Sequence, residues 1–161
     1  MCIVRKEVQY SAWRIGSMKI LLTIVSIVIF FACRVTMVAP YDEKIAQQIQ
    51  LISKKIDKLY LTMLEVSEDN PPERTYALFT DQYIEIEVEL NALLLQNRLR
   101  PLNNESIRNS EIALETWIKY KEKHKQENTL SDFEIDLNRD YFRDLFMVLL
   151  VGEEVRINLN K

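Results

Sequence analysis

The sequence predicts an all-α protein, and two observations support that prediction. The chain has 161 residues with only two glycines and four prolines, a composition that favours helices. After position 40 its apolar residues recur three and four residues apart, which is the spacing of one face of an α-helix. We expect an up-and-down antiparallel bundle of four helices, with a three-helix bundle as the alternative.

The first predicted helix follows Pro40 and has the longest apolar seam in the chain. The seam residues alternate in steps of four and three and are Ile45, Ile49, Ile52, Ile56, Leu59, Met63 and Val66. Lysines and glutamines fill much of the opposite face, as expected for an amphipathic helix. The sequence Asn70-Pro71-Pro72-Glu73 predicts the end of this helix and the cap of the next.

The second predicted helix contains an ambiguous stretch. Its helical seam comprises Tyr76, Phe79, Tyr83, Ile86, Leu90 and Leu93. Between Ile84 and Leu90, however, apolar residues alternate with glutamates, a pattern that is typical of a strand when taken alone. We favour a helix because the three and four spacing continues on both sides, and Pro101 predicts its end near Leu99.

Two more helices are expected. The third covers residues 104–126, with Ile107, Leu114, Trp117 and Ile118 facing inward. The fourth begins with the capping box Ser131-Asp132-Phe133-Glu134 and is predicted to stop at Gly152. Its predicted core stripe is Phe133, Leu137, Tyr141, Leu145 and Val148. The bundle is thus expected over residues 41–152, with residues 153–161 as a tail.

The N-terminal region contains an uncharged apolar stretch. Fourteen residues from Ile20 to Cys33 carry no charge, and as a helix they would extend roughly 21 Å, against about 30 Å for a bilayer core. This length is typical of the apolar region of a signal peptide, and Arg14 and Lys19 supply the preceding positive charge. Residues 1–33 are therefore predicted as a signal peptide or membrane anchor, with Met18 as the true start and residues 34–40 as a tether.

The end of this stretch resembles a known processing site. The sequence Phe30-Phe31-Ala32-Cys33 resembles the lipobox of bacterial lipoproteins, and Pro40-Tyr41-Asp42-Glu43 is similar to the element that opens the helical domain of some small lipoproteins. The resemblance implies cleavage before Cys33, a diacylglyceryl group on its sulfur, and a fatty acid such as palmitate on the new amino end. It also implies a lipid-anchored protein of the bacterial cell envelope that faces the periplasm, and it supplies no catalytic residues.

Two other interpretations of the N-terminal region stay open. Residues 20–39 are also consistent with an uncleaved, single-pass anchor in the inner membrane, or with the first helix of a soluble core. For a lipoprotein, Arg34 favours the outer membrane, because an aspartate after the cysteine is a common signal for inner-membrane retention. Cys2 and Cys33 are the only cysteines, so residues 34–161 have no disulfide to form.

The charge balance excludes one class of function. Residues 1–33 hold four of the 21 cationic and one of the 24 acidic residues, so residues 34–161 carry 17 cations against 23 acids, a net charge of −6. Phosphate contacts need a basic face, so we expect no nucleic acid as a partner.

The inventory of reactive residues predicts no enzyme. His124 is the only histidine, whereas a ferritin-like di-iron bundle needs Glu-x-x-His on two helices and zinc sites need clustered cysteine and histidine. Glycine-rich phosphate loops have no match. We therefore expect no metal, cofactor or catalytic residue, and no specific ligand-binding residues are assigned.

Three groups of residues also admit a functional interpretation. Glu85 and Glu89 share a helical face that suits a cation, and the lysines between Lys119 and Lys125 suit anionic lipid; in both cases a solvated face is the simpler interpretation. Aromatic residues suit either a ligand pocket or a packed core, namely Tyr76, Phe79, Tyr83, Trp117, Tyr141 and Phe142.

The expected function follows from the predicted location and from the absence of a reactive site. We expect a membrane-tethered helical module outside the cytoplasm with a structural or interaction role and an envelope protein as partner. The anchor is Cys33 or residues 20–39. The alternatives are a bundle that binds a small apolar ligand and a single-pass envelope protein.

Overall fold

A computed structural model describes residues 38–66 and 74–159. The predicted leader, Cys33 and the sequence Asn70-Pro71-Pro72-Glu73 lie outside the described residues. The described chain contains four α-helices and one short 3-10 helix, in the order α2 (Glu43–Leu64), η2 (Tyr76–Phe79), α3 (Thr80–Leu99), α4 (Asn104–Glu127) and α5 (Asp132–Leu159). The predicted all-α class is confirmed.

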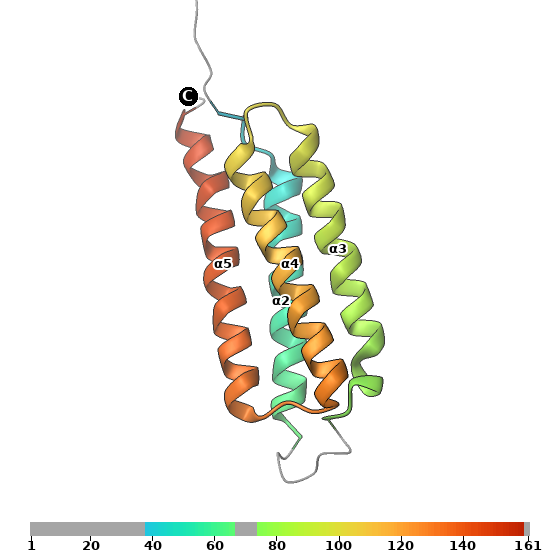
Figure 1. The fold of residues 1–161 in the computed structure, drawn as a ribbon. Coiled ribbons are helices and arrows are strands. Elements are labelled where there is room, and N and C mark those ends of the chain that lie inside the picture. The colour runs from blue at the N-terminus through green and yellow to red at the C-terminus, as the bar shows by residue number, and fades with distance from the viewer. Residues whose placement is uncertain (1–37, 67–73, 160–161) are drawn as a thin grey trace, which may run out of the picture. The chain divides into compact units, whose positions relative to one another are not determined.

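The helices form the up-and-down bundle that the sequence predicts. Successive helices run in opposite directions (Figure 1). Each helix packs against the one that follows it in the chain, and α5 closes the bundle against α2. Short links between helices favour this arrangement, since they hold sequential helices side by side. The four-helix prediction is therefore confirmed and the three-helix alternative is wrong.

The helix α2 buries the seam that its sequence predicts. From Ile45 to Met63 every predicted seam residue is buried, and Tyr60 is buried beside them. The Asp42 side chain caps the helix, because its Oδ1 accepts hydrogen bonds from the backbone N–H groups of Lys44 at 2.9 Å and Ile45 at 3.4 Å.

The ambiguous stretch from Ile84 to Leu90 is helical, as predicted, and α3 ends at Leu99 before Pro101. The predicted seam from Phe79 to Leu93 is buried, with Tyr76 packed partly buried against it. The α-helix begins at Thr80, later than the sequence suggested, because η2 precedes it. Ile84 and Val88 face solvent, so α3 is apolar on two sides, which explains its strand-like alternation.

The helix α4 contributes small and polar residues to the core. Around Trp117 it buries Ser106, Ser110, Ala113 and His124. The prediction for Ile118 is wrong, because its side chain is 38% exposed, and Ile107 and Leu114 are only half-buried. Apolar spacing alone misplaced this face by about a quarter turn, since serine and histidine are not core residues on a hydropathy criterion.

The predicted core stripe of the fourth helix is wrong. Phe133 is 76% exposed, Leu137 is 55% exposed, Tyr141 and Val148 also face solvent, and Leu145 is only half-buried. The core side of α5 is instead Ile135, Phe142, Phe146 and Leu149, with Asn138. The helix has two apolar stripes, and the sequence prediction selected the outer one.

Two further predictions concern the ends of α5, namely a capping box at its start and a stop at Gly152. The capping box is confirmed, because the backbone N–H of Ser131 donates to Glu134 Oε2 at 3.0 Å and the N–H of Glu134 donates to Ser131 Oγ at 3.3 Å. The predicted stop at Gly152 is wrong, since α5 continues to Leu159. Residues 153–159, predicted as a tail, form its last two turns, where Glu153 and Arg156 are buried.

The orientation of α5 is testable with two phenylalanines on the same helix. Phe146→Ala should lower the free energy of unfolding by about 3–5 kcal/mol, because it opens a cavity in the core. Phe133→Ala should change it by no more than about 0.5 kcal/mol, because that ring is largely exposed. Urea denaturation followed by circular dichroism measures both. Equal losses, or a larger loss at Phe133, would contradict the observed orientation.

Candidate functional site

Residues 39–42, where the described chain begins, are hydrogen-bonded to one end of the bundle. Ala39 is buried, and its backbone N–H donates to the carbonyl of Leu102 at 3.2 Å. Arg100 donates from Nη2 to the carbonyl of Pro40. The N–H of Asp42 donates to Glu153 Oε2 at 3.3 Å. The chain that leads into α2 is thus fixed to α3 and α5 before the first helical turn.

The carboxylate of Glu153 is the centre of this bundle end. Its side chain is 1% exposed and lies between two guanidinium groups. Arg100 donates to it at 2.8 and 3.2 Å, and Arg156 donates at 3.0 Å. Arg156 also donates to Ser106 Oγ at 2.9 Å, so the cluster joins α3, α4 and α5. Burial lowers the pKa of Arg156 and the charge of Glu153 opposes that change.

Uncharged polar groups extend the cluster into the bundle. Asn97 donates to Ser110 Oγ at 2.8 Å, and Ser110 in turn donates to the carbonyl of Ser106 at 2.7 Å. Asn103 donates to both the backbone and side-chain oxygens of Asn97 at 2.9 Å. We call the set Asn97, Arg100, Asn103, Ser106, Ser110, Glu153 and Arg156 the polar layer. It is a structural network whose hydrogen bonds stabilise one arrangement of the helices.

The opposite end of the bundle is held by a buried arginine. Arg74 is 1% exposed, and its guanidinium donates to the carbonyl of Val66 at 3.0 Å and to the carbonyl of Leu130 at 3.2 Å. It also pairs with the carboxylate of Asp132 at 2.6 Å. Arg74 therefore joins the end of α2 to the start of α5.

His124 lies in the core next to this arginine. Its Nε2 is 2.8 Å from the carbonyl of Arg74, which can only accept, so Nε2 carries the proton. Its Nδ1 then accepts from the hydroxyl of Tyr83 at 3.0 Å. Burial lowers the pKa of His124, and the carbonyl of Arg74 and the charge of Glu127 oppose that change. The imidazole is thus a neutral, fully bonded core group.

The aromatic residues that the sequence analysis selected pack against one another. Ring centroids are 5.1 Å apart for Tyr83 and Trp117, 5.6 Å for Trp117 and Phe142, and 5.5 Å for Tyr76 and Tyr83. Trp117 Nε1 donates to the carbonyl of Tyr83 at 3.2 Å. Tyr141 lies at the edge of this group, with its ring centroid 5.8 Å from that of Phe142 and 6.1 Å from that of Tyr120. These contacts give the buried rings a core-packing role.

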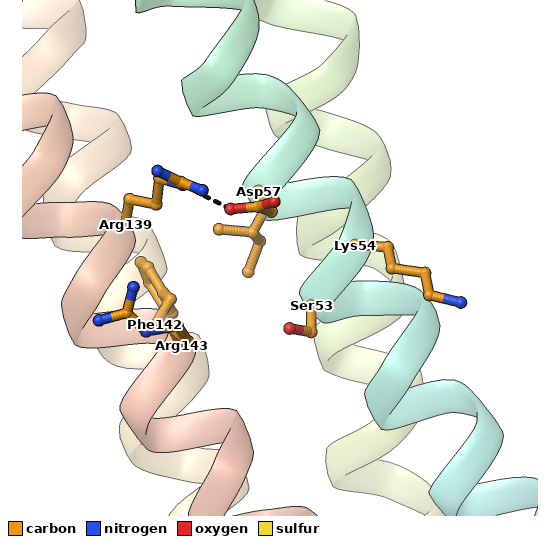
Figure 2. Close-up of a pocket in the computed structure, with 7 residues that line it drawn as sticks. Ser53, Lys54, Asp57, Arg139, Phe142 and Arg143 are labelled. Carbon is orange, nitrogen blue, oxygen red and sulfur yellow. Dashed lines mark hydrogen bonds and ion pairs between the residues drawn. The ribbon is translucent and has the colours of Figure 1, made fainter.

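A surface pocket of about 230 Å³ lies between α2 and α5. Ile56 and Phe142 form its apolar floor, and Ser53, Lys54, Asp57, Arg139 and Arg143 line its rim. Figure 2 shows Arg139 reaching from α5 to Asp57 on α2, with Nε and Oδ1 2.5 Å apart, while Lys54 points away from α5. The pocket lining contains no histidine or cysteine, and its ion pair joins two helices.

Ion pairs occupy the acidic face considered as a binding site and two of the lysines considered as a lipid contact. Lys55 lies 2.9 Å from Glu85 and 2.7 Å from Glu89, so these two acids hold a lysine of α2. Lys121 pairs with Glu87 at 2.6 Å, and Lys123 pairs with Glu134. Together with the amide of Ser131, Lys123 lowers the pKa of Glu134 to about 2. Within residues 38–66 and 74–159 no cluster of acidic, histidine or cysteine side chains suits a metal ion.

The sequence analysis missed the buried polar residues, and a weak signal for them exists. His124 follows Trp117 by seven residues, and Glu153 follows Phe146 by seven, so each lies on the core face of its helix. That signal becomes visible only once the core face is known. Arg74 had no such signal, because its acceptors are largely backbone carbonyls.

Comparison with protein-family models, curated proteins and solved structures finds no match for this chain. In the part of the chain that the structure describes, no helix has the length and apolar character needed to cross a membrane.

Glu153 and its neighbour Glu154 test the polar layer. Glu153→Gln should lower the free energy of unfolding by about 3 kcal/mol, because two guanidinium groups lose their buried counter-charge. The matched variant Glu154→Gln lies on the exposed side of α5 and should change stability by about 0.5 kcal/mol or less. Urea denaturation of both variants measures the difference. A stable Glu153→Gln protein would show that the charge of the layer contributes little.

His124 should make stability depend on pH. Its pKa in the folded protein is below the ordinary 6.5, so the unfolded chain binds the proton more readily. The stabilising contribution is therefore complete above pH 6.5 and is lost as the pH falls through the lower folded pKa. The slope should reach at most about 1.4 kcal/mol per pH unit.

The measurement compares the parent protein with His124→Gln, which keeps a donor and cannot be protonated, by urea denaturation between about pH 8 and about pH 5. The stability advantage of the parent over the variant should shrink as the pH falls. Parallel profiles would contradict the assignment. The low pKa of Glu134 does not interfere, because its effect begins below 4.5.

Proposed function

We propose that the protein is a lipid-anchored helical module of a bacterial envelope, with a structural or protein-interaction role outside the cytoplasm. The proposed anchor is Cys33, which ends the apolar stretch that begins at Ile20. One fatty-acyl chain gives only marginal membrane binding, whereas the diacylglyceryl group and an added acyl chain make it durable. Outer-membrane placement, favoured by Arg34, is part of the proposal.

The observation that supports this role is the way residues 39–42 are fixed to the bundle. Ala39, Pro40 and Asp42 are bonded to Leu102, Arg100 and Glu153. Only residues 34–38 separate Cys33 from Ala39, and an extended chain covers about 3.5 Å per residue. An anchor at Cys33 would therefore hold this bundle end within roughly 20 Å of the lipid. Such close tethering suits a module that acts on a partner at the membrane surface.

The absence of a reactive site in the described chain is consistent with this role. Aromatic rings pack in the core, most of the buried polar side chains are hydrogen-bonded, and Glu85 and Glu89 hold a lysine. The alternatives of a small apolar ligand and of an uncleaved single-pass anchor over residues 20–39 stay predictions, as does the expectation that the protein is not an enzyme.

Metabolic labelling tests the anchor. Bacteria expressing the chain are grown with an alkyne-tagged palmitate, and the protein is recovered and tested for the tag. We expect label on the parent protein and on Cys2→Ser, and none on Cys33→Ser, which should also leave the membrane fraction. Label that persists in Cys33→Ser, or an unlabelled parent protein, would refute the lipid anchor.

A further inference from the structure

The helix α5 carries an apolar row on its solvent side. Its positions are Leu137, Tyr141, Asp144, Val148, Val151 and Val155, and we call this row the outer seam. The five apolar members are between 39% and 56% exposed. Phe133 and Met147 extend the same side. An exposed apolar row of this length on a folded protein indicates an interaction site.

The spacing of the outer seam indicates the shape of its partner. Successive members are 4, 3, 4, 3 and 4 residues apart, which is the heptad spacing that packs one helix against another. From Leu137 to Val155 the seam extends roughly 27 Å, or five helical turns. A row with this spacing runs nearly parallel to the helix axis, so an aligned helix can contact it over its whole length.

The charges beside the seam indicate the chemistry of the partner. Asp136, Asp140, Asp144 and Glu154 are exposed on this side of α5. Arg143 reaches Asp140 at 2.9 Å and Asp144 at 3.9 Å, and Arg139 is already held by Asp57. Arg139 also acts on Asp136 and Asp140, but with Asp57 included the acids still outnumber the two arginines, so this face has a negative excess. A partner with lysines or arginines beside its apolar side would be complementary.

The exposed apolar residues of α3 differ from those of α5 in the charge that lies beside them. Ile84, Val88 and Leu95 also face solvent, but the neighbouring acids Glu85, Glu87 and Glu89 are paired with Lys55 and Lys121 of the same bundle. The acidic charge beside α3 is therefore largely balanced within the bundle, while the four acids beside α5 share Arg143 and part of the charge of Arg139 and keep a negative excess.

We propose that the outer seam of α5 binds an amphipathic helix of another protein whose apolar side is flanked by lysine or arginine. The inference rests on the interaction role proposed above and names its partner, but it does not depend on the anchor at Cys33. Asp144 interrupts the apolar row between Tyr141 and Val148, where a cation of the partner reaches it and fixes the register. A second copy of this chain is disfavoured, because it would bring two acidic faces together.

A designed peptide of about three heptads serves as the probe, with leucine at both core positions and lysine at the flanking ones. Two further peptides act as controls, one with glutamate in place of lysine and one with the lysine peptide's residues in scrambled order. The full chain is held in phosphatidylcholine nanodiscs, and binding is measured by fluorescence anisotropy against empty discs. We expect the lysine peptide to bind at least about tenfold more tightly than either control.

Substitutions locate the binding face. Val148→Ser with Val151→Ser should weaken binding of the lysine peptide at least about tenfold, whereas the matched pair Val88→Ser with Leu95→Ser on α3 should change it less than about twofold. All four positions are exposed, so the fold should be retained, which circular dichroism checks. Asp140→Lys with Asp144→Lys should reverse the preference toward the glutamate peptide.

Several outcomes would overturn the inference. If the scrambled peptide bound as tightly as the lysine peptide, the binding would be a charge effect alone. If the α3 variant lost as much affinity as the α5 variant, the contact would lie elsewhere. A concentration-dependent dimer that Val148→Ser with Val151→Ser abolishes would identify a second copy as the occupant, and equal signal from empty discs would indicate lipid. Peptide binding by a parent protein that takes up no label would refute the anchor alone, and a labelled parent protein that does not bind the peptide would refute the seam alone.

Discussion

The buried carboxylate of Glu153 is the constraint on which the arrangement of the helices depends. A carboxylate at 1% exposure is costly to bury unless cations and donors surround it, and here Arg100 and Arg156 do so. Arg100 is at the end of α3, Ser106 at the start of α4, and the amide of Asp42 at the start of α2. Moving α3 along its axis would separate Arg100 from Glu153, and moving α2 or α4 would break the hydrogen bond from Asp42 or the one to Ser106.

This constraint also decides which side of α5 faces the core. The helix has two apolar stripes, one with Phe142, Phe146 and Leu149 and the other with Leu137, Tyr141 and Val148. Hydrophobic burial alone favours neither strongly. Glu153 lies four residues after Leu149 and seven after Phe146, so it belongs to the first stripe. Burying the second stripe would turn Glu153 away from Arg100, and the polar layer thus selects the observed orientation.

These relations explain how far the sequence predicts the structure. The helices and most of their ends follow from local signals, such as the seam of α2, Pro101 after α3 and the capping box at Ser131. The orientation of α5 does not, because two stripes satisfy the same periodicity and the deciding contact lies 53 residues away at Arg100. In α4 the core face is built from Ser106, Ser110 and His124, whose burial depends on partners in other helices.

The candidate sites differ in the same respect: some rest on a local sequence pattern and others depend on residues far away in the chain. The proposal for Cys33 rests on a local sequence pattern, whereas Arg74 and His124 bond to backbone carbonyls, which no pattern of side chains reveals. Leu137, Tyr141 and Val148 of the outer seam were visible in the sequence as part of an apolar row, but the sequence alone assigned them to the core.

The exposure of the outer seam has a thermodynamic consequence. Apolar side chains stabilise a fold in proportion to the area that folding removes from water, about 25 cal/mol per Å². Val148, Val151 and Val155 remain about half exposed in the folded bundle, so a large part of that free energy is not used in folding. That free energy becomes available only when a second molecule covers the outer seam. Because the residues that hold the fold lie on the other side of α5, a partner can bind or leave the seam while the bundle stays intact.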